Sequence, residues 1–225
     1  MHSHILPGLD DGAPDVATSL RLIAGLGDLG FRKCFATPHV MADLYPNTPP
    51  RIAYALMEAR AEVRARGSDM RLGAAGEYFL DEGFPERLDR GEVLALPGRR
   101  VLVEWSALGA SPYVALGLDR LRERGCVPVI AHPERYGDYG VGAWRELRSG
   151  GCELQVNLTS LVGAYGRRGR EMAGALLTEG LVDFGGSDCH DLRQLTTLSE
   201  LLADRTAMRL LTGAGLRNRE LDAHL

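Results

Sequence analysis

The sequence predicts an α/β protein whose parallel strands form a closed or nearly closed barrel with helices on the outside. Short apolar runs, typical of buried strands, alternate with longer segments of helical periodicity along the whole chain. Acidic residues and histidines recur at the ends of these apolar runs. A barrel carries its active site at the carboxyl ends of its strands, whereas a doubly wound open sheet gathers its ligands at one switch point. The repeated clusters therefore favour the barrel.

Six short apolar segments are expected to be strands. They are residues 33–37, 70–76, 100–105, 126–131, 152–157 and 181–185. A barrel of this kind needs a further strand before His2, but only Met1 stands there. The first strand is therefore expected to be truncated or absent.

The expected helices follow from capping residues and apolar stripes. The first lies between Pro14 and Gly30, because proline suits a first helical turn and glycine suits a C-terminal cap. Two more begin after Thr48 and Ser111, which are capping residues followed by proline. The helix after Thr48 continues through residues 51–66, and helical periodicity also marks residues 168–179 and 193–212.

Composition limits the classes of protein. The chain has 225 residues, 45% of them hydrophobic, which fits one globular domain spanning residues 1–225. The chain contains no run of about 18 apolar residues, so no membrane span is expected. No signal peptide is expected before the first histidines. A formal net charge of -4 gives no general attraction for nucleic acid. We expect a cytoplasmic protein without membrane insertion and without a nucleic-acid partner.

The cysteines argue against thiol chemistry. They are Cys34, Cys126, Cys152 and Cys189, and no two of them form a C-x-x-C pair. Such a set is typical of a reduced, cytoplasmic chain with buried thiols. None has an arginine six positions later, the spacing that a thiol-based tyrosine phosphatase loop requires.

The clusters at the strand ends have the composition of a site for several divalent cations. His2 and His4, spaced i and i+2, point to one side of an extended segment, and Asp188 and His190 repeat this spacing. A single such histidine or acid is more often structural, but the joint set indicates metal ligands. Mixed imidazole and carboxylate ligands suit Mn, Fe or Zn better than Mg or Ca. Arg135, three residues after His132, could hold phosphoryl oxygens.

Six motifs together carry a resemblance to a known family. They are H-S-H-I-L-P-G-L-D-D-G, A-T-P-H, G-E-Y, V-E-W, A-H-P-E-R-Y and G-S-D-C-H. In order and approximate spacing they resemble the PHP (polymerase and histidinol phosphatase) superfamily. Within it the chain is most similar to the bacterial tyrosine-protein phosphatases of capsular and exopolysaccharide operons. The resemblance covers essentially the whole chain.

The resemblance implies a distorted (β/α)7 TIM-like barrel and a site for two or three divalent metal ions, with Mn expected and Fe or Zn possible. Glu104 is the expected bridging carboxylate, and Arg135 the phosphate-binding residue. Asp11 is preferred to Asp10 because it directly precedes the glycine of its motif, and Asp11 and Arg135 are the expected catalytic residues. The implied metal ligands are His2, His4, Asp11, His39, Glu77, Glu104, His132, Asp188 and His190.

The expected function is hydrolysis of phosphotyrosine in proteins by attack of a metal-bound hydroxide. The expected partner, on the resemblance alone, is a bacterial tyrosine kinase of polysaccharide export. One alternative is a small-molecule phosphatase, such as one acting on histidinol phosphate. A second is a non-catalytic metal-binding scaffold, which the full ligand set disfavours, and a nuclease is disfavoured by the net charge. The oligomeric state is left open.

Overall fold

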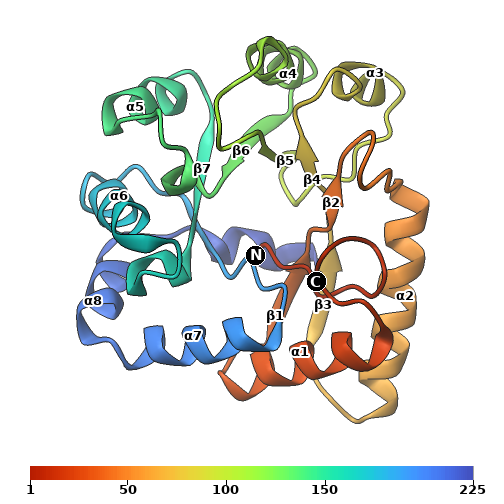
Figure 1. Cartoon of the computed structure of the whole chain (residues 1–225). Coiled ribbons are helices and arrows are strands. Elements are labelled where there is room, and N and C mark those ends of the chain that lie inside the picture. Colours follow the sequence, from red (N-terminus) through yellow and green to blue (C-terminus); the bar gives the residue numbers. More distant parts are fainter. Residues whose placement is uncertain (225) are drawn as a thin grey trace.

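The computed structural model describes residues 1–224 and shows a parallel sheet curled into a distorted barrel, with helices around its outer side (Figure 1). Six strands are paired in the order β2-β4-β5-β6-β7-β8, and β1 pairs with β3. The strands are β1 (Lys33–Ala36), β2 (His39–Val40), β3 (Arg71–Ala74), β4 (Glu77–Phe79), β5 (Arg100–Glu104), β6 (Val127–Ala131), β7 (Glu153–Asn157) and β8 (Phe184–Gly186). Every pair is parallel, as the alternation of strands and helices predicts.

Two of the expected strands end earlier than predicted, and a further short strand follows each of them after an interruption. The chain of β1 continues after Pro38 as β2, and the chain of β3 continues after Gly76 as β4. Proline cannot donate a ladder hydrogen bond, and at Gly76 the ring of Tyr78 lies 2.6 Å from the position of a Cβ atom. The pairing resumes with His39 directly beside Glu77, so the interruption brings two candidate ligands together.

The N-terminal segment His2–His4 takes the place of the first strand. Ser3 forms a parallel bridge with Cys189, just after β8, and the amide of His4 donates to the carbonyl of Cys189 at 2.9 Å. On the other side, the amide of Thr37, just after β1, donates to the carbonyl of Ser3 at 2.8 Å. The expectation of a truncated first strand is confirmed, and this short segment links the two edges of the barrel.

Eight helices and three short 3-10 turns connect the strands within residues 1–224. They are α1 (Val16–Asp28), α2 (Pro49–Ala65), α3 (Phe84–Asp89), α4 (Pro112–Glu123), α5 (Val141–Ser149), α6 (Gly166–Thr178), α7 (Leu192–Ala203), α8 (Arg205–Gly213), η1 (Pro133–Arg135), η2 (Leu158–Val162) and η3 (Asn218–His224). Thr48 caps α2 as predicted, with its side chain accepting from the amide of Arg51. None of these helices is both long and apolar enough to cross a bilayer.

Two sequence predictions were wrong in their boundaries. The helix expected over 193–212 is divided into α7 and α8, because the carboxylate of Asp204 accepts from the amides of Thr206 and Ala207 and so begins a new helix. The strand expected over 181–185 is β8, which begins only at Phe184. Asp183 instead accepts hydrogen bonds from the amide of Leu154 and the guanidinium of Arg148.

The side chains on the inward faces of the strands are charged at the amino end of the barrel, apolar in the middle and polar at the carboxyl end. On β5 the residues Arg100, Leu102 and Glu104 alternate onto one face, and on β7 the sequence is Glu153, Gln155 and Asn157. Arg100 and Glu153 form an ion pair of 2.7 Å at the amino end. The middle layer is apolar and contains Phe35, Ala75, Leu96, Leu102, Val129, Ala131, Phe184 and Leu221. The polar residues beyond this layer therefore gather at the carboxyl end.

Candidate metal and phosphate site

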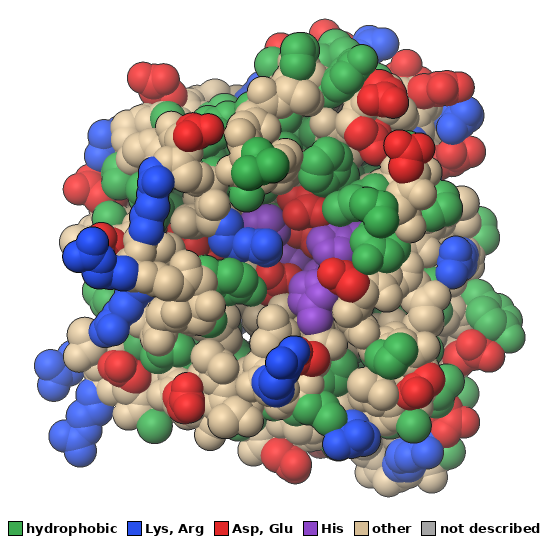
Figure 2. Space-filling view, viewed as in Figure 1, with side chains coloured by type: hydrophobic (Ala, Val, Ile, Leu, Met, Phe, Trp, Pro, Cys, Tyr) green, Lys and Arg blue, Asp and Glu red, His purple; other side chains and the backbone are tan. Residues whose placement is uncertain are grey.

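The structure brings all the predicted ligands together at the carboxyl ends of the strands. They come from the N-terminal segment, the loop before α1, the starts of β2 and β4, the end of β5, and the residues after β6 and β8. Figure 2 shows histidine and acidic side chains in a hollow at the centre of this face, with basic side chains beside it.

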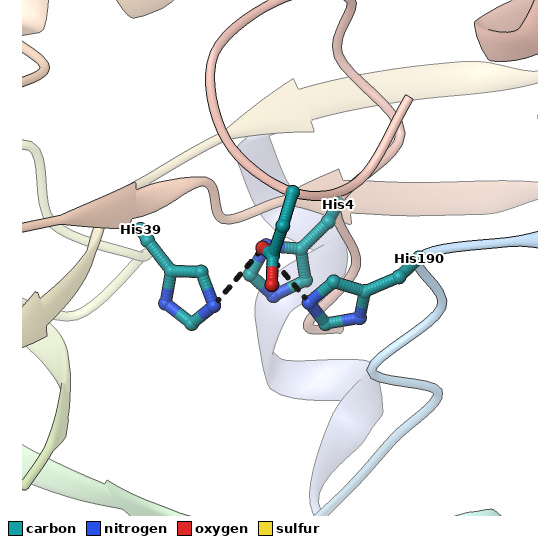
Figure 3. Close-up of side chains that lie close together, drawn as sticks. His4, His39 and His190 are labelled. Atoms are coloured by element: carbon teal, nitrogen blue, oxygen red, sulfur yellow. Dashed lines mark ion pairs between the residues drawn. The ribbon is translucent and has the colours of Figure 1, made fainter. Parts of the chain in front are cut away.

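The donor atoms form three overlapping groups, in each of which they lie within 4.8 Å of one another. The groups are His4, Asp11, His39 and His190; His2, His4 and Glu77; and His39, Glu77 and Glu104. Figure 3 shows the rings of His4, His39 and His190 converging on a carboxylate. Because His4, His39 and Glu77 each belong to two groups, the arrangement suits adjacent cations that share ligands.

Glu77 and Asp188 lie between histidine nitrogens. Glu77 Oε2 is 3.3 Å from Nε2 of both His2 and His4, and 3.0 Å from His39 Nδ1. Asp188 Oδ1 is 3.2 Å from His2 Nε2 and 3.3 Å from His4 Nε2. Glu77 and Asp188 thus form the buried anionic centre of the cluster.

Several polar atoms in this centre are buried without a hydrogen-bond partner. Among the described residues they include Glu77 Oε2, Glu104 Oε1 and His39 Nδ1. Unpaired buried polar atoms are costly, and such atoms in native structures call for an explanation. Here carboxylate and imidazole atoms point their lone pairs at one another, and a divalent cation placed between them would accept those lone pairs. The mixed set of nitrogen and oxygen donors suits Mn, Fe or Zn.

The carboxylates of the cluster raise the pKa of the histidines beside them. Burial acts to lower the pKa of His2, but the negative charges of Glu77 and Asp188 outweigh it and raise that pKa to about 9. Burial opposes the same effect at His39, where Glu77 and Glu104 raise the pKa to about 10. In the metal-free chain a pKa above 7 favours the protonated form of both histidines at neutral pH.

The two neighbouring aspartates have different positions. Asp11 Oδ1 lies 3.6 Å from His39 Nε2 and 3.5 Å from His190 Nε2, and its side chain is 57% exposed. Asp10 instead accepts from His4 Nδ1 at 2.6 Å and from the amides of Gly12 and His39. Burial acts to raise the pKa of Asp10, but His4 and the amide donors lower it to about 2. Asp11 thus belongs to the donor group with His39 and His190, whereas Asp10 orients the His4 ring.

A second supporting network runs along β7 and was not predicted. Gln155 Oε1 accepts from His2 Nδ1 at 2.5 Å, and Gln155 Nε2 donates to Asn157 Oδ1 at 3.0 Å. Asn157 Nδ2 then donates to Asp188 Oδ2 at 2.6 Å. The signal was present in E-L-Q-V-N, where the two amides lie on one face of the strand together with Glu153.

The backbone is strained at three of the clustered residues. His2, His132 and Asp188 have φ of 64°, 36° and 50°, in the left-handed region that residues other than glycine rarely adopt. Such conformations persist where the surrounding structure imposes them, and they concentrate at functional sites. Here they aim side chains at the cluster from the ends of strands.

Arg135 lies beside the cluster, at the end of the single turn η1. Its amide donates to the carbonyl of His132 at 2.9 Å, and its Nη1 lies 3.4 Å from Asp188 Oδ2. The neighbouring Glu134 does not orient this arginine. It accepts from the amide of Asn157 and from Ser160 Oγ, and so fastens η1 to the end of β7.

Comparison with known proteins shows which family and which fold the chain resembles. A family model described as capsular polysaccharide synthesis, CpsB/CapC, matches residues 1–200. The tyrosine-protein phosphatase YwqE of Bacillus subtilis is 26% identical over 204 residues, which cover 86% of this chain and 77% of that protein. The tyrosine-protein phosphatase CpsB of Streptococcus pneumoniae is 28% identical over 200 residues, which cover 85% of this chain and 82% of that protein.

A similar solved structure extends the likeness to three dimensions. It belongs to work on YwqE from Bacillus subtilis and CpsB from Streptococcus pneumoniae, described as unique metal-dependent tyrosine phosphatases. The TM-score is 0.82 at 25% sequence identity, and the match covers 97% of this chain and 93% of that chain. The distorted barrel predicted from the sequence is therefore confirmed.

Proposed function

The chain belongs to the CpsB/CapC family of capsular polysaccharide synthesis, and on this basis we propose that it is a metal-dependent phosphatase acting on phosphotyrosine in proteins. The observation that carries the proposal is the position of Arg135 beside a buried cluster of histidines and carboxylates. A cluster of this kind binds cations, and an arginine next to it supplies the donors that a phosphoryl group requires. The similar proteins named as tyrosine phosphatases support the same conclusion.

The cofactors of this proposal are two or three divalent metal ions, with Mn preferred and Fe or Zn as the alternatives. When bound, such ions lower the pKa of water and neutralise charge on the phosphoryl oxygens during an in-line displacement. The proposed ligands are His2, His4, Asp11, His39, Glu77, Glu104, His132, Asp188 and His190. Seven of them are supported by the overlapping donor groups, which contain neither His132 nor Asp188. His132 is supported by its Nε2 lying 3.1 Å from Glu77 Oε1, and Asp188 by its Oδ1 lying 3.2 Å from His2 Nε2.

The remaining chemistry is assigned to the protein's own side chains. Arg135 binds the phosphoryl oxygens, since its side chain is 37% exposed beside the cluster. Asp11 lies at the mouth of the site, where the phosphoryl group arrives. Asp10 and Gln155 hold the rings of His4 and His2, so that their Nε2 atoms remain directed at the centre.

The proposed partner is a phosphotyrosine protein, and specifically a tyrosine kinase of polysaccharide export. The role of the family in capsular polysaccharide synthesis supports this partner. We also propose that residues 1–225 form one domain and that the protein is cytoplasmic. The four free cysteines support a reducing compartment.

A parallel assay tests the proposed function. Phosphate release is measured from a phosphotyrosine peptide, a phosphoserine peptide and histidinol phosphate, each with chelator-treated protein and with protein reloaded with Mn, Fe or Zn. We expect turnover of the phosphotyrosine peptide only with metal. Preference for histidinol phosphate would identify a small-molecule phosphatase. Metal binding without turnover of any substrate would contradict the proposal and favour a scaffold.

A further inference from the structure

Tyr165 connects the candidate metal cluster to Arg135 through two different parts of its side chain. Its hydroxyl lies 3.2 Å from Asp188 Oδ2, to which it donates, and 3.3 Å from Asn157 Nδ2, from which it accepts. The guanidinium of Arg135 lies over its ring, 5.0 Å from the ring centroid. Because Tyr165 contacts both the candidate ligand Asp188 and the phosphate-binding Arg135, it can hold the arginine in a fixed position beside the metal cluster.

Arg135 has few other contacts that could hold its guanidinium. The bond from its Nη1 to Asp188 Oδ2 is 3.4 Å long and therefore weak. Within residues 1–224 its Nη2 and Nε donors have no hydrogen-bond partner, so they are available to an incoming phosphoryl group. A long and partly exposed side chain of this kind loses considerable rotamer entropy when it binds. A ring that already supports the guanidinium reduces this loss.

The backbone around Tyr165 is built to bring it to the site. Gly163 and Gly166, on either side, have φ of 87° and 79°, which glycine adopts without strain. At Gly169, in the first turns of α6, a Cβ atom would lie 3.3 Å from the Cβ of Tyr165 and 3.9 Å from the carbonyl of Glu134. Helix α6 therefore packs closely against η1, the turn that carries Arg135.

We propose that Tyr165 is a positioning residue for phosphate binding, whose ring holds the Arg135 guanidinium toward the phosphoryl group and whose hydroxyl anchors that ring to Asp188. The inference deepens the proposed function and rests on it, because it concerns how the same site binds its substrate. Loss of the ring should weaken phosphate binding more than loss of the hydroxyl, since the ring makes the contact with Arg135. The hydroxyl contributes less, because Asn157 also donates to Asp188 Oδ2.

Three substitutions separate these contributions. Tyr165→Leu removes ring and hydroxyl, Tyr165→Phe keeps the ring, and Tyr54→Leu removes a tyrosine that is 59% exposed on α2. With Mn-loaded proteins and p-nitrophenyl phosphate, we expect Tyr165→Leu to raise KM and the inhibition constant of inorganic phosphate about three- to thirtyfold. Tyr165→Phe should stay within about threefold of wild type. Tyr54→Leu should match wild type.

A double-mutant cycle with Arg135→Ala distinguishes positioning from a general loss of structure. If the ring acts through the arginine, Tyr165→Leu should have no further effect on phosphate inhibition when Arg135 is already alanine. Metal content and melting temperature of every variant are measured alongside. The proposal is overturned if Tyr165→Leu binds phosphate as wild type does, or if its effect persists undiminished in the Arg135→Ala background.

Binding of inorganic phosphate to the Mn-loaded proteins, measured by calorimetry, keeps this inference separate from the proposed function. Failure of wild type to hydrolyse aryl phosphates would count against the function alone. In that case the phosphate dissociation constants of Tyr165→Leu, Tyr165→Phe and Arg135→Ala are compared with that of wild type. Equal constants for wild type and Tyr165→Leu would reject the positioning role in either case.

Discussion

At the scale of single residues, the site depends on the side chains that orient the histidine rings. Asp10 is the clearest example, because it accepts from His4 Nδ1 and from two backbone amides. Asp10→Asn keeps the shape of the side chain but removes its charge and one acceptor. We expect this change to weaken Mn affinity about 10- to 100-fold, the usual effect of losing such a partner. Titration calorimetry of the metal-free protein measures it.

Asp15→Asn is the matched control for that substitution. Asp15 caps α1 outside the site by accepting from the amide of Thr18, and asparagine caps helices equally well. The control should bind Mn as wild type does. Equal Mn affinity in Asp10→Asn and Asp15→Asn would show that Asp10 has no role in orienting His4.

The thiols should have no part in catalysis. Cys189 is buried close to the candidate ligands, and burial together with nearby carboxylates raises its pKa to about 12, so it is protonated at neutral pH. Burial also raises the pKa of Cys34 and Cys152. We expect turnover to survive iodoacetamide treatment and to vanish with chelator. A phosphocysteine trapped during turnover would refute a metal-based mechanism.

At the scale of elements, the loop between the N-terminal segment and α1 is fitted closely against His4. A Cβ atom at Gly12 would lie 2.1 Å from the carbonyl oxygen of His4. Gly12→Ala should therefore displace Asp10, Asp11 or His4, with a cost of about 1–3 kcal/mol in stability and a clear loss of bound Mn. Urea unfolding and elemental analysis report the two effects.

Gly142→Ala provides the comparison for Gly12→Ala. Gly142 lies within α5, and a Cβ atom there meets nothing within 4 Å. Alanine in a helix is more stable than glycine by roughly 0.5–1 kcal/mol, so this variant should be slightly stabilised and should keep its metal. If Gly12→Ala kept its stability and its bound Mn as Gly142→Ala does, the close packing of the loop against His4 would have no role in metal binding.

The sequence predicted the elements unequally, for physical reasons. The strands β5 and β6 were evident because their centres are continuous and apolar. In β7 the apolar residues Leu154 and Val156 alternate with polar ones, which is also typical of a strand. The short strands β2 and β4 were missed, since each follows a residue that interrupts pairing, Pro38 or Gly76. The break between α7 and α8 was missed because the residues on both sides of Asp204 have helical periodicity. Only the hydrogen bonds of the Asp204 side chain to the following amides show that a new helix begins there.

The candidate site was predicted more fully than its supporting contacts. Histidines and carboxylates at strand ends stand out in the sequence, and the structure brings them together. The contacts of Asp10, Gln155 and Tyr165 depend on pairings between distant segments, such as His2 with Gln155. Such pairings follow from the fold and have no local pattern, apart from the alternating amides of β7.

At the scale of the whole molecule, the candidate ligands come from both ends of the chain. His2 and His4 meet Asp188 and His190 where the N-terminal segment joins the edges of the barrel. Metal binding should therefore stabilise the whole fold, by about 2.7 kcal/mol at a free concentration of 100 Kd. Scanning calorimetry should show one cooperative transition that shifts downward with chelator. Identical melting temperatures for loaded and metal-free protein would contradict this link.

The metal-free protein should also lose stability in alkaline solution. The pKa values of His2 and His39 are raised to about 9 and about 10 in the folded chain. Their contribution is complete below the unfolded value of about 6.5 and is lost as the pH rises through the folded values. Urea midpoints of the metal-free protein should therefore fall between about pH 6.5 and pH 10. Those of the Mn-loaded protein should change less, because cations replace the protons. Parallel midpoints for both forms would contradict the account.

The central claim is that this barrel holds a cluster of divalent metals at the carboxyl ends of its strands. Anomalous diffraction at the manganese edge, from crystals of Mn-reconstituted protein, tests it most directly. We expect two or three peaks within the donor groups formed by His2, His4, Asp11, His39, Glu77, Glu104 and His190. Manganese bound only elsewhere on the protein, or no peak between these residues at saturating Mn, would contradict the claim.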